Sequence, residues 1–172
     1  LGSMKMKGLL FWLILVSPLP IHAARPAAKP SAAVLRTVDG GKVQVADLHK
    51  KGPAVLWFTN LCANCQGGFA GMDGVVKASA GTKATVTAVS FIKGDRERVQ
   101  GLIRDRQPAF PILLDVAGAV TKKYTGAQPA NACPMTNLVI LDRKGKVIYR
   151  GHYPGVTPGE LIRRVREATP AR

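Results

Sequence analysis

Two cysteines, Cys62 and Cys65, are the residues whose type and spacing are best suited to chemistry. They follow the apolar run 54–59, in the order expected for a buried strand, a turn and the start of a helix. At a helix N-terminus, unpaired backbone N–H groups and the helix dipole favour the thiolate over the thiol. The thiolate is the nucleophile in thiol–disulfide exchange. The pattern therefore predicts that Cys62 attacks and that Cys65, one turn later, resolves the mixed disulfide.

Other uses of this pair have less support. A purely structural disulfide across two residues closes a very small loop and stabilises a fold little. A structural zinc site takes four ligands, and beyond the pair the chain offers only Cys133 and scattered histidines. His49 and His152 lie in expected loops, and we interpret both as solvated surface residues rather than ligands.

The third cysteine, Cys133, makes the cysteine count of this chain odd. At most two of the three thiols can pair within one molecule, so one is left over or the pairing changes during a reaction cycle. One interpretation of Cys133 is an inert buried thiol, because cysteine is among the most buried residue types. The other is functional: Cys133 could exchange disulfides with Cys62, or complete a three-thiolate site with Cys65, which would favour Cu(I) and Zn.

The pattern of apolar residues predicts the elements that must position these thiols. Alternation around residues 39–41 predicts an N-terminal hairpin over 34–48. Further strands are expected at 54–59, 82–92, 110–114, 137–141 and 147–149. Helices are expected at 66–80, 95–106, 116–124 and 157–168. Strands that alternate with helices indicate an α/β fold, and the last two strands, with no helix between them, indicate an antiparallel edge.

Two details of the expected helices can be tested. Asp95 and Thr157 are expected at the N-caps of their helices, with Pro158 in the first turn after Thr157. The expected helix 66–80 is weakened by four glycines, namely Gly67, Gly68, Gly71 and Gly74.

The start of the chain predicts export. Residues 1–3 are interpreted as a cloning remnant and residues 4–23 as a signal peptide, with a positive start and an apolar core too short for the ~20 residues of a spanning helix. Residues 24–31, rich in Ala and Pro, are expected to form a linker. The predicted location is secreted or periplasmic, and contact with a membrane is expected only if the signal is not cleaved.

The charge of the chain is strongly positive. The net charge of +15 falls to +13 when the signal, with Lys5 and Lys7, is removed. Such a surface suggests acidic partners, anionic lipid or simply solubility. Apart from a group near the end of the chain, the basic residues are scattered, and no RNA- or DNA-binding motif is present, so we expect no nucleic-acid partner.

In its order of segments, the chain resembles the thioredoxin-like family of exported redox proteins, in the TlpA-like or redoxin branch related to AhpC/TSA. The resemblance covers about residues 34–168, and we expect one domain over 32–170. The matching segments are the Asp39-Gly40 hairpin, Trp57 to Cys65, Phe110 to Asp115, and Leu138 to Val147. The resemblance implies a central mixed sheet flanked by helices, with the N-terminal β-hairpin as an extension. It also implies a thiol–disulfide oxidoreductase that acts on protein thiols or disulfides, needs a redox partner and uses no organic cofactor.

The chain departs from the family pattern at three points. Ala63-Asn64 replaces the usual pair between the cysteines, and this pair helps to set the reduction potential. Counting back from Asp142, the family's cis-proline position falls on Thr136, whereas the nearest proline is Pro134. Cys133 lies in the same loop, which the family fold would place opposite Cys62. Cys133, Pro134 and Thr136 are therefore the expected auxiliary residues of the site.

Three other functions remain open. The first is a copper-binding or metallochaperone module that uses Cys62, Cys65 and Cys133 to hold Cu(I). A weaker one is a peroxiredoxin-like peroxidase: Thr59 stands where peroxiredoxins have threonine, but Val55 replaces their proline and no arginine lies near Thr136. The third is a non-catalytic binding domain in which the two cysteines only form a disulfide.

Overall fold

The computed structural model describes residues 33–127 and 132–169. The expected cloning remnant (1–3), signal peptide (4–23) and linker (24–31) therefore lie outside the described residues. Within the described part, no helix has both the length and the apolar character needed to cross a bilayer.

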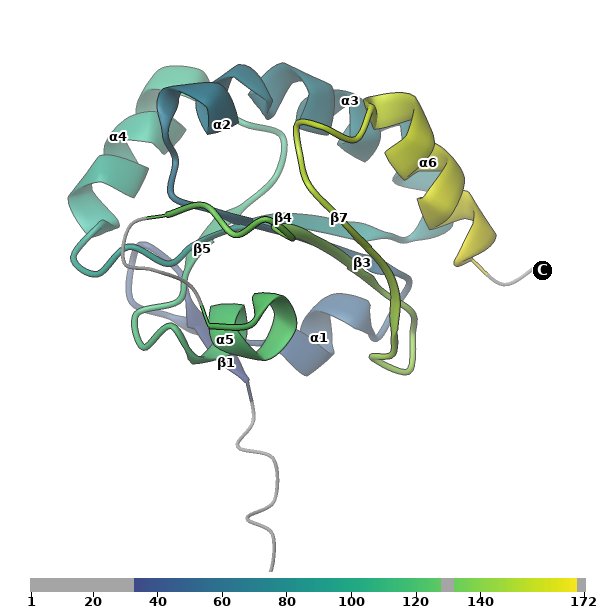
Figure 1. Ribbon diagram of the computed structural model, residues 1–172, viewed down its shortest axis with the longest axis horizontal. Coiled ribbons are helices and arrows are strands. Elements are labelled where there is room, and N and C mark those ends of the chain that lie inside the picture. The colour runs from purple at the N-terminus through teal and green to yellow at the C-terminus, as the bar shows by residue number, and fades with distance from the viewer. Residues whose placement is uncertain (1–32, 128–131, 170–172) are drawn as a thin grey trace, which may run out of the picture.

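A mixed seven-stranded sheet forms the centre of the molecule, in the order β2-β1-β5-β4-β3-β6-β7 (Figure 1). The strands are β1 (Val34–Arg36), β2 (Lys42–Gln44), β3 (Ala54–Thr59), β4 (Thr85–Ser90), β5 (Ile112–Leu114), β6 (Leu138–Leu141) and β7 (Val147–Gly151). Strand β3 lies between β4, to which it is parallel, and β6, to which it is antiparallel. All of its side chains are buried, as its continuous apolar run predicts.

Helices cover both faces of this sheet. They are α1 (Val45–His49), α2 (Ala63–Gly67), α3 (Phe69–Ala78), α4 (Arg96–Arg106), α5 (Ala119–Thr125) and α6 (Pro158–Glu167), with a 3-10 turn η1 (Ala80–Thr82). In Figure 1, α2, α3, α4 and α6 lie on one face, and α1 and α5 lie on the other. The predicted α/β class, with a mixed sheet flanked by helices and an N-terminal hairpin, is confirmed.

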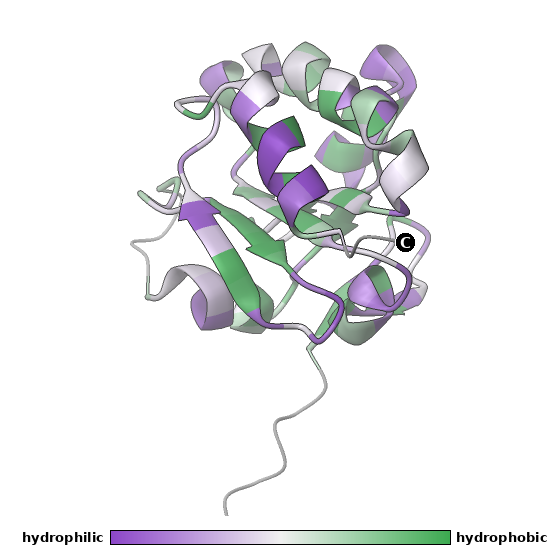
Figure 2. Ribbon diagram, turned by 90° about the vertical axis from the view of Figure 1, so that its right-hand side faces the viewer, coloured by the Kyte–Doolittle hydropathy of each residue, from purple (hydrophilic) through white to green (hydrophobic). Residues whose placement is uncertain are grey.

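Each face of the sheet has its own hydrophobic core, because alternate side chains of a strand point to opposite faces. Trp57 belongs to the core under α3 and α6, and its neighbour Phe58 belongs to the core under α1 and α5. Trp57 makes edge-to-face contacts with Phe69 and with Tyr153, at ring-centroid distances of 5.7 and 5.1 Å. In Figure 2 the inner strands are mainly hydrophobic, and hydrophilic residues gather on the outer surfaces of the helices. The strand that leads to Cys62 is thus held rigidly from both sides.

The structure corrects two sequence expectations. The expected second strand of the hairpin ends at Gln44, and residues 45–49 form α1, because Val45 and Leu48 are both buried and their spacing suits one face of a helix. The expected helix 66–80 begins earlier, at Ala63, and is divided at Gly68 into α2 and α3.

The two expected helix caps behave differently. Thr157 caps α6, and its Oγ1 accepts a hydrogen bond from the backbone N–H of Glu160 at 3.3 Å. Asp95 stands at the N-cap of α4, but its side chain makes no capping bond. Its carboxylate instead accepts a hydrogen bond from the hydroxyl of Ser90 at 2.7 Å and thereby ties the start of α4 to the end of β4.

Candidate active site

Cys62 stands at the point where β3 passes into α2. It is the N-cap residue of α2, and the turn before it contains Leu61 in the left-handed backbone region, with φ of 55°. A non-glycine residue in this region is uncommon and needs support from its surroundings. The support comes from two side chains: Thr59 Oγ1 accepts from the N–H of Leu61 at 2.9 Å, and Asn60 Oδ1 accepts from the N–H of Cys62 at 3.1 Å. These bonds fix the direction in which Cys62 leaves the strand.

The two cysteines of the pair differ in accessibility. The Sγ atoms of Cys62 and Cys65 lie 3.4 Å apart, and both residues are free thiols. Cys62 is partly exposed, whereas Cys65 is only 3 % exposed. A substrate can therefore reach Cys62, while Cys65 lies behind it, within the distance that a small movement would close to a disulfide.

The two thiols also differ in acidity. Burial raises the pKa of Cys62, but the backbone N–H of Cys65, its thiol and further hydrogen-bond donors outweigh this effect, so the pKa falls below its ordinary value. Burial raises the pKa of Cys65 to about 12, and its contacts with the other two thiols add to the increase. The site thus has one thiol that ionises more readily than an ordinary cysteine and one that ionises less readily.

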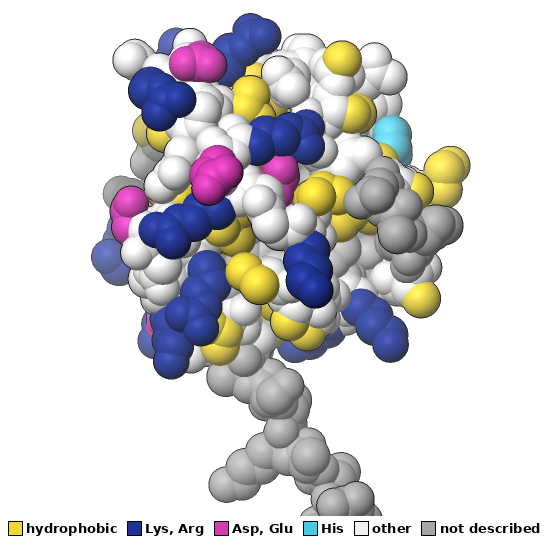
Figure 3. Space-filling view, turned by 90° about the vertical axis from the view of Figure 1, so that its left-hand side faces the viewer, with side chains coloured by type: hydrophobic (Ala, Val, Ile, Leu, Met, Phe, Trp, Pro, Cys, Tyr) yellow, Lys and Arg dark blue, Asp and Glu magenta, His cyan; other side chains and the backbone are white. Residues whose placement is uncertain are grey.

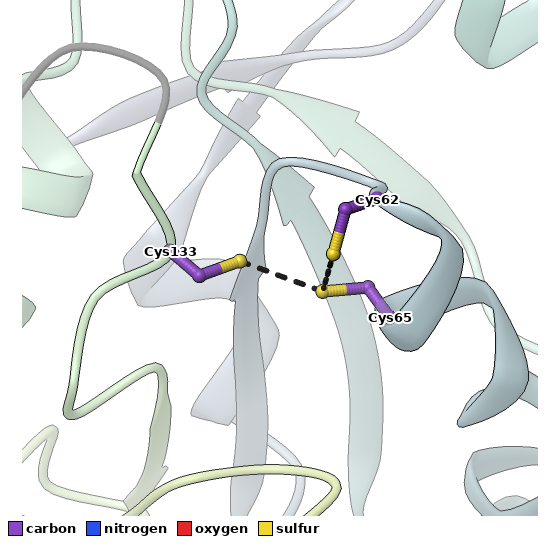
Figure 4. Close-up of side chains that lie close together, drawn as sticks. All are labelled: Cys62, Cys65 and Cys133. Atoms are coloured by element: carbon purple, nitrogen blue, oxygen red, sulfur yellow. Dashed lines mark hydrogen bonds between the residues drawn. The ribbon is translucent and has the colours of Figure 1, made fainter.

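Cys133 comes from a distant part of the chain and completes a cluster of three thiols. Its Sγ lies 3.5 Å from that of Cys65 and 2.9 Å from Asn60 Oδ1, which accepts its hydrogen bond. Figure 4 shows all three sulfurs directed toward one another, two from the start of α2 and one from the loop before β6. The loop expected to face Cys62 does so.

The other two auxiliary residues expected in this loop take different positions. Pro134 is buried and Thr136 is partly exposed. Among the described residues, the cis peptide bond lies at neither of them but between Tyr153 and Pro154, in the loop that follows β7.

That loop and the cysteines enclose a cleft of about 650 Å³. Its walls are formed by Cys62, Ala63, Asn64, Cys65, Gly67, Cys133, Asn137, His152, Tyr153, Pro154 and Gly155. His152, interpreted from the sequence as a surface residue, is exposed and lines the cleft. His49 is half-buried, and its Nδ1 lies 3.2 Å from the carbonyl oxygen of Arg143, outside the cleft. The cleft is a surface against which a peptide next to a disulfide could lie.

Three residues that support the site were missed by the sequence analysis. Asn137 is fully buried, and its side chain donates to the carbonyl of Tyr153 at 2.8 Å and accepts from its N–H at 2.7 Å. Tyr153 in turn donates its hydroxyl to the carbonyl of Gly68 at 2.7 Å. Asn60 contacts both Cys62 and Cys133. One feature of the sequence could have indicated Asn137: it is a polar residue at the start of an apolar run, and a buried amide side chain needs hydrogen-bond partners.

Comparison with known proteins identifies the family of the chain. Residues 26–150 match the AhpC/TSA family. The chain belongs to the AhpC/TSA family. No curated protein sequence matches it closely enough to count as a relative.

Several solved structures are similar to this chain. MTB dsbF, in its mixed oxidized and reduced forms, is 25% identical, with 80% of this chain and 96% of that chain covered and a TM-score of 0.61. StoA from Bacillus subtilis is 21% identical over 80% of this chain and 98% of that one, with a TM-score of 0.61. A secreted Mycobacterium tuberculosis disulfide oxidoreductase homologous to E. coli DsbE is 22% identical over 79% and 96%, again with a TM-score of 0.61. The thioredoxin-like fold is thereby confirmed, and the predicted oxidoreductase class is supported.

Proposed function

We propose that this protein is an exported thiol–disulfide oxidoreductase in which Cys62 is the nucleophile and Cys65 the resolving thiol. The observation that carries the proposal is the difference between two thiols whose Sγ atoms lie 3.4 Å apart. Cys62 is partly exposed and has a lowered pKa, whereas Cys65 is buried and has a pKa of about 12. Thiol–disulfide exchange needs this asymmetry. One sulfur must be accessible to the substrate and attack as the thiolate, and the other must react only after the mixed disulfide has formed. The fold shared with MTB dsbF supports the same function.

In the reductive direction, the reaction consists of two exchanges. The Cys62 thiolate attacks one sulfur of a substrate disulfide, forms a mixed disulfide and releases the first substrate thiolate. Cys65 then loses its proton and attacks Cys62 Sγ, which releases the second substrate thiol and leaves a Cys62–Cys65 disulfide. Two electrons have passed to the substrate, and a dithiol partner protein must return them. The same steps in reverse would oxidise a substrate dithiol.

The cleft beside Cys62 suggests how a protein substrate is held. The loop with Pro134 and the loop with Pro154 flank the cysteines, and Asn137 joins the two loops through its hydrogen bonds to Tyr153. A rigid, open cleft of this kind suits an extended peptide segment around a cysteine. It places the substrate sulfur next to the partly exposed Cys62.

The setting of this activity is proposed to be outside the cytoplasm. The positive start and short apolar core of residues 4–23 support export of a single domain over 32–170, tethered by residues 24–31. That one structurally similar protein is secreted agrees with this location. The redox partner and the substrate would then be exported proteins as well.

Two substitutions test the roles of the cysteines. Cys62→Ser is expected to abolish reduction of a disulfide peptide by the protein, because the accessible thiol with the lowered pKa is removed and Cys65, which remains, is buried with a pKa of about 12. Cys65→Ser is expected to accumulate a mixed disulfide between Cys62 and the substrate, visible as a covalent adduct by non-reducing electrophoresis and mass spectrometry. Full peptide reduction by Cys62→Ser, or an adduct attached to another cysteine, would contradict the assignment.

A further inference from the structure

The exchange reaction uses two thiols, yet the site holds three. The Sγ atoms of Cys62, Cys65 and Cys133 all lie within 4.8 Å of one another, with edges of 3.4 and 3.5 Å at Cys65. Three sulfurs bound in a plane to one ion, at metal–sulfur distances of about 2.3 Å, would lie about 4 Å apart. The observed triangle is therefore close to the size that a single ion requires (Figure 4).

The same triangle does not suit a relay of disulfides. In thiol–disulfide exchange, the attacking sulfur approaches along the line of the bond that breaks. With edges of 3.4 and 3.5 Å and a third edge of at most 4.8 Å, no angle of the triangle exceeds a right angle. Cys133 is thus not aligned to attack a disulfide between the other two cysteines, but all three sulfurs converge on one point.

The third thiol is held in place by its surroundings. Asn60 Oδ1 accepts a hydrogen bond from Cys133, and the same oxygen accepts from the backbone N–H of Cys62. At the other end of the short loop, the carbonyl oxygen of Asn137 accepts from the N–H of Phe58 in β3 at 2.7 Å. The thiols from two distant segments are therefore brought together before any ligand arrives, which lowers the cost of binding.

We propose that Cys62, Cys65 and Cys133 of the reduced protein bind one Cu(I) ion as three thiolates. Thiolates are soft ligands that select Cu(I) and Zn, and structural zinc sites are completed by four ligands. Within residues 33–127 and 132–169, no further His, Cys, Asp or Glu joins this cluster, so the donor set fits a three-coordinate soft ion better than zinc. As three S–Cu bonds form, up to three protons leave the thiols and no electron is transferred. Cys62 is partly exposed, so the ion can enter and leave from the cleft.

The proposal is tested by anaerobic titration of the reduced full chain with Cu(I) in competition with a chromophoric Cu(I) chelator. One ion per chain is expected. Cys133→Ser is expected to lower the affinity for Cu(I) by at least about 100-fold, because removal of a ligand should weaken binding more than removal of a residue that only supports a ligand. Met135→Leu is the matched control, because Met135 lies in the same loop but is 84 % exposed and is not part of the cluster. This substitution removes a soft sulfur, and the affinity for Cu(I) should not change. Equal affinity in Cys133→Ser, or no binding by the unmodified protein, overturns the proposal.

A second measurement does not depend on whether the variant folds. X-ray absorption at the copper edge of the loaded, unmodified protein should give three sulfur neighbours at one distance, close to that of trigonal Cu(I)–thiolate bonds. Two sulfur neighbours would mean that Cys133 takes no part and would overturn the proposal. Circular dichroism of Cys133→Ser shows separately whether its loss of affinity arises in a folded chain.

Discussion

At the scale of single residues, the different acidities of Cys62 and Cys65 give a pH-dependent prediction. A thiol reacts with iodoacetamide as the thiolate, so a lowered pKa moves reactivity to lower pH and a raised pKa moves it to higher pH. In the reduced protein, alkylation of Cys62 should have its midpoint below the ordinary thiol pKa of 9.0. Cys65, with a pKa of about 12, should stay unmodified at neutral pH. Peptide mapping by mass spectrometry across a pH series measures both.

The unfolded chain provides the control for this experiment. In denaturant the hydrogen bonds and burial that separate the two thiols are lost, so both should ionise near the ordinary value. Alkylation of Cys65 as fast as that of Cys62 in the folded protein at pH 7 would contradict the predicted asymmetry.

The cysteine pair could be predicted from sequence because its setting is local. A buried strand, a short turn and a helix start all lie within about a dozen residues of Cys62, and each has its own pattern. The part played by Asn137 could not be predicted in the same way, because its partner Tyr153 belongs to a different loop. The position of Cys133 was expected only from the family resemblance, since no local pattern relates it to Asn60, 73 positions away.

At the scale of elements, Gly68, between α2 and α3, and Gly71, within α3, let this part of the chain pack closely against Tyr153. A Cβ atom at Gly71 would lie 2.4 Å from the Tyr153 hydroxyl oxygen, and one at Gly68 would lie 2.6 Å from a ring carbon of the same residue. By helix propensity these glycines only weaken a helix, and propensity alone does not reveal that they leave space for an aromatic ring. The ring they admit forms part of the wall of the cleft.

Gly71→Ala and Gly74→Ala form a matched pair that tests this role in one helix. Gly71→Ala should destabilise the protein by about 1–3 kcal/mol, because Tyr153 must move and the core is overpacked. Gly74 has no atom near its Cβ position, so Gly74→Ala should stabilise the helix by about 0.5–1 kcal/mol. Denaturant unfolding of both reduced variants measures the two free energies, and the same sign of change in both would contradict the argument.

Strand β3 was predicted correctly from the sequence, whereas helix α1 was not. The bounds of β3 agree with the apolar run 54–59, because a central strand buried on both faces has an unambiguous composition. Residues 45–48 directly follow the three-residue strand β2 and were expected to continue it. They form α1 instead, since burial of Val45 and Leu48 against the sheet outweighs the local alternation.

At the scale of the whole molecule, the order of strands depends on contacts that no local pattern records. The N-terminal hairpin was predicted, but its attachment to the sheet rests on the antiparallel pairing of Arg36 with Leu114 in β5. The hairpin thereby extends the edge of the sheet opposite to β7. The cysteine cleft, formed by α2 and by the loops before β6 and after β7, lies toward the other side of β3, so the extension leaves the cleft open.

The positive net charge, +15 for the whole chain and +13 without the signal, should make exchange selective for acidic substrates. Figure 3 shows Lys and Arg side chains spread over one face of the molecule, with fewer acidic ones between them. At low salt, a disulfide peptide flanked by glutamates should react at least about tenfold faster than one of equal length flanked by lysines. The difference should shrink as the ionic strength rises from about 0.01 to 0.15 M, because the Debye length falls from roughly 30 to 8 Å. Stopped-flow measurement of both peptides tests this, and equal rates at low salt would show that the positive surface does not guide the substrate.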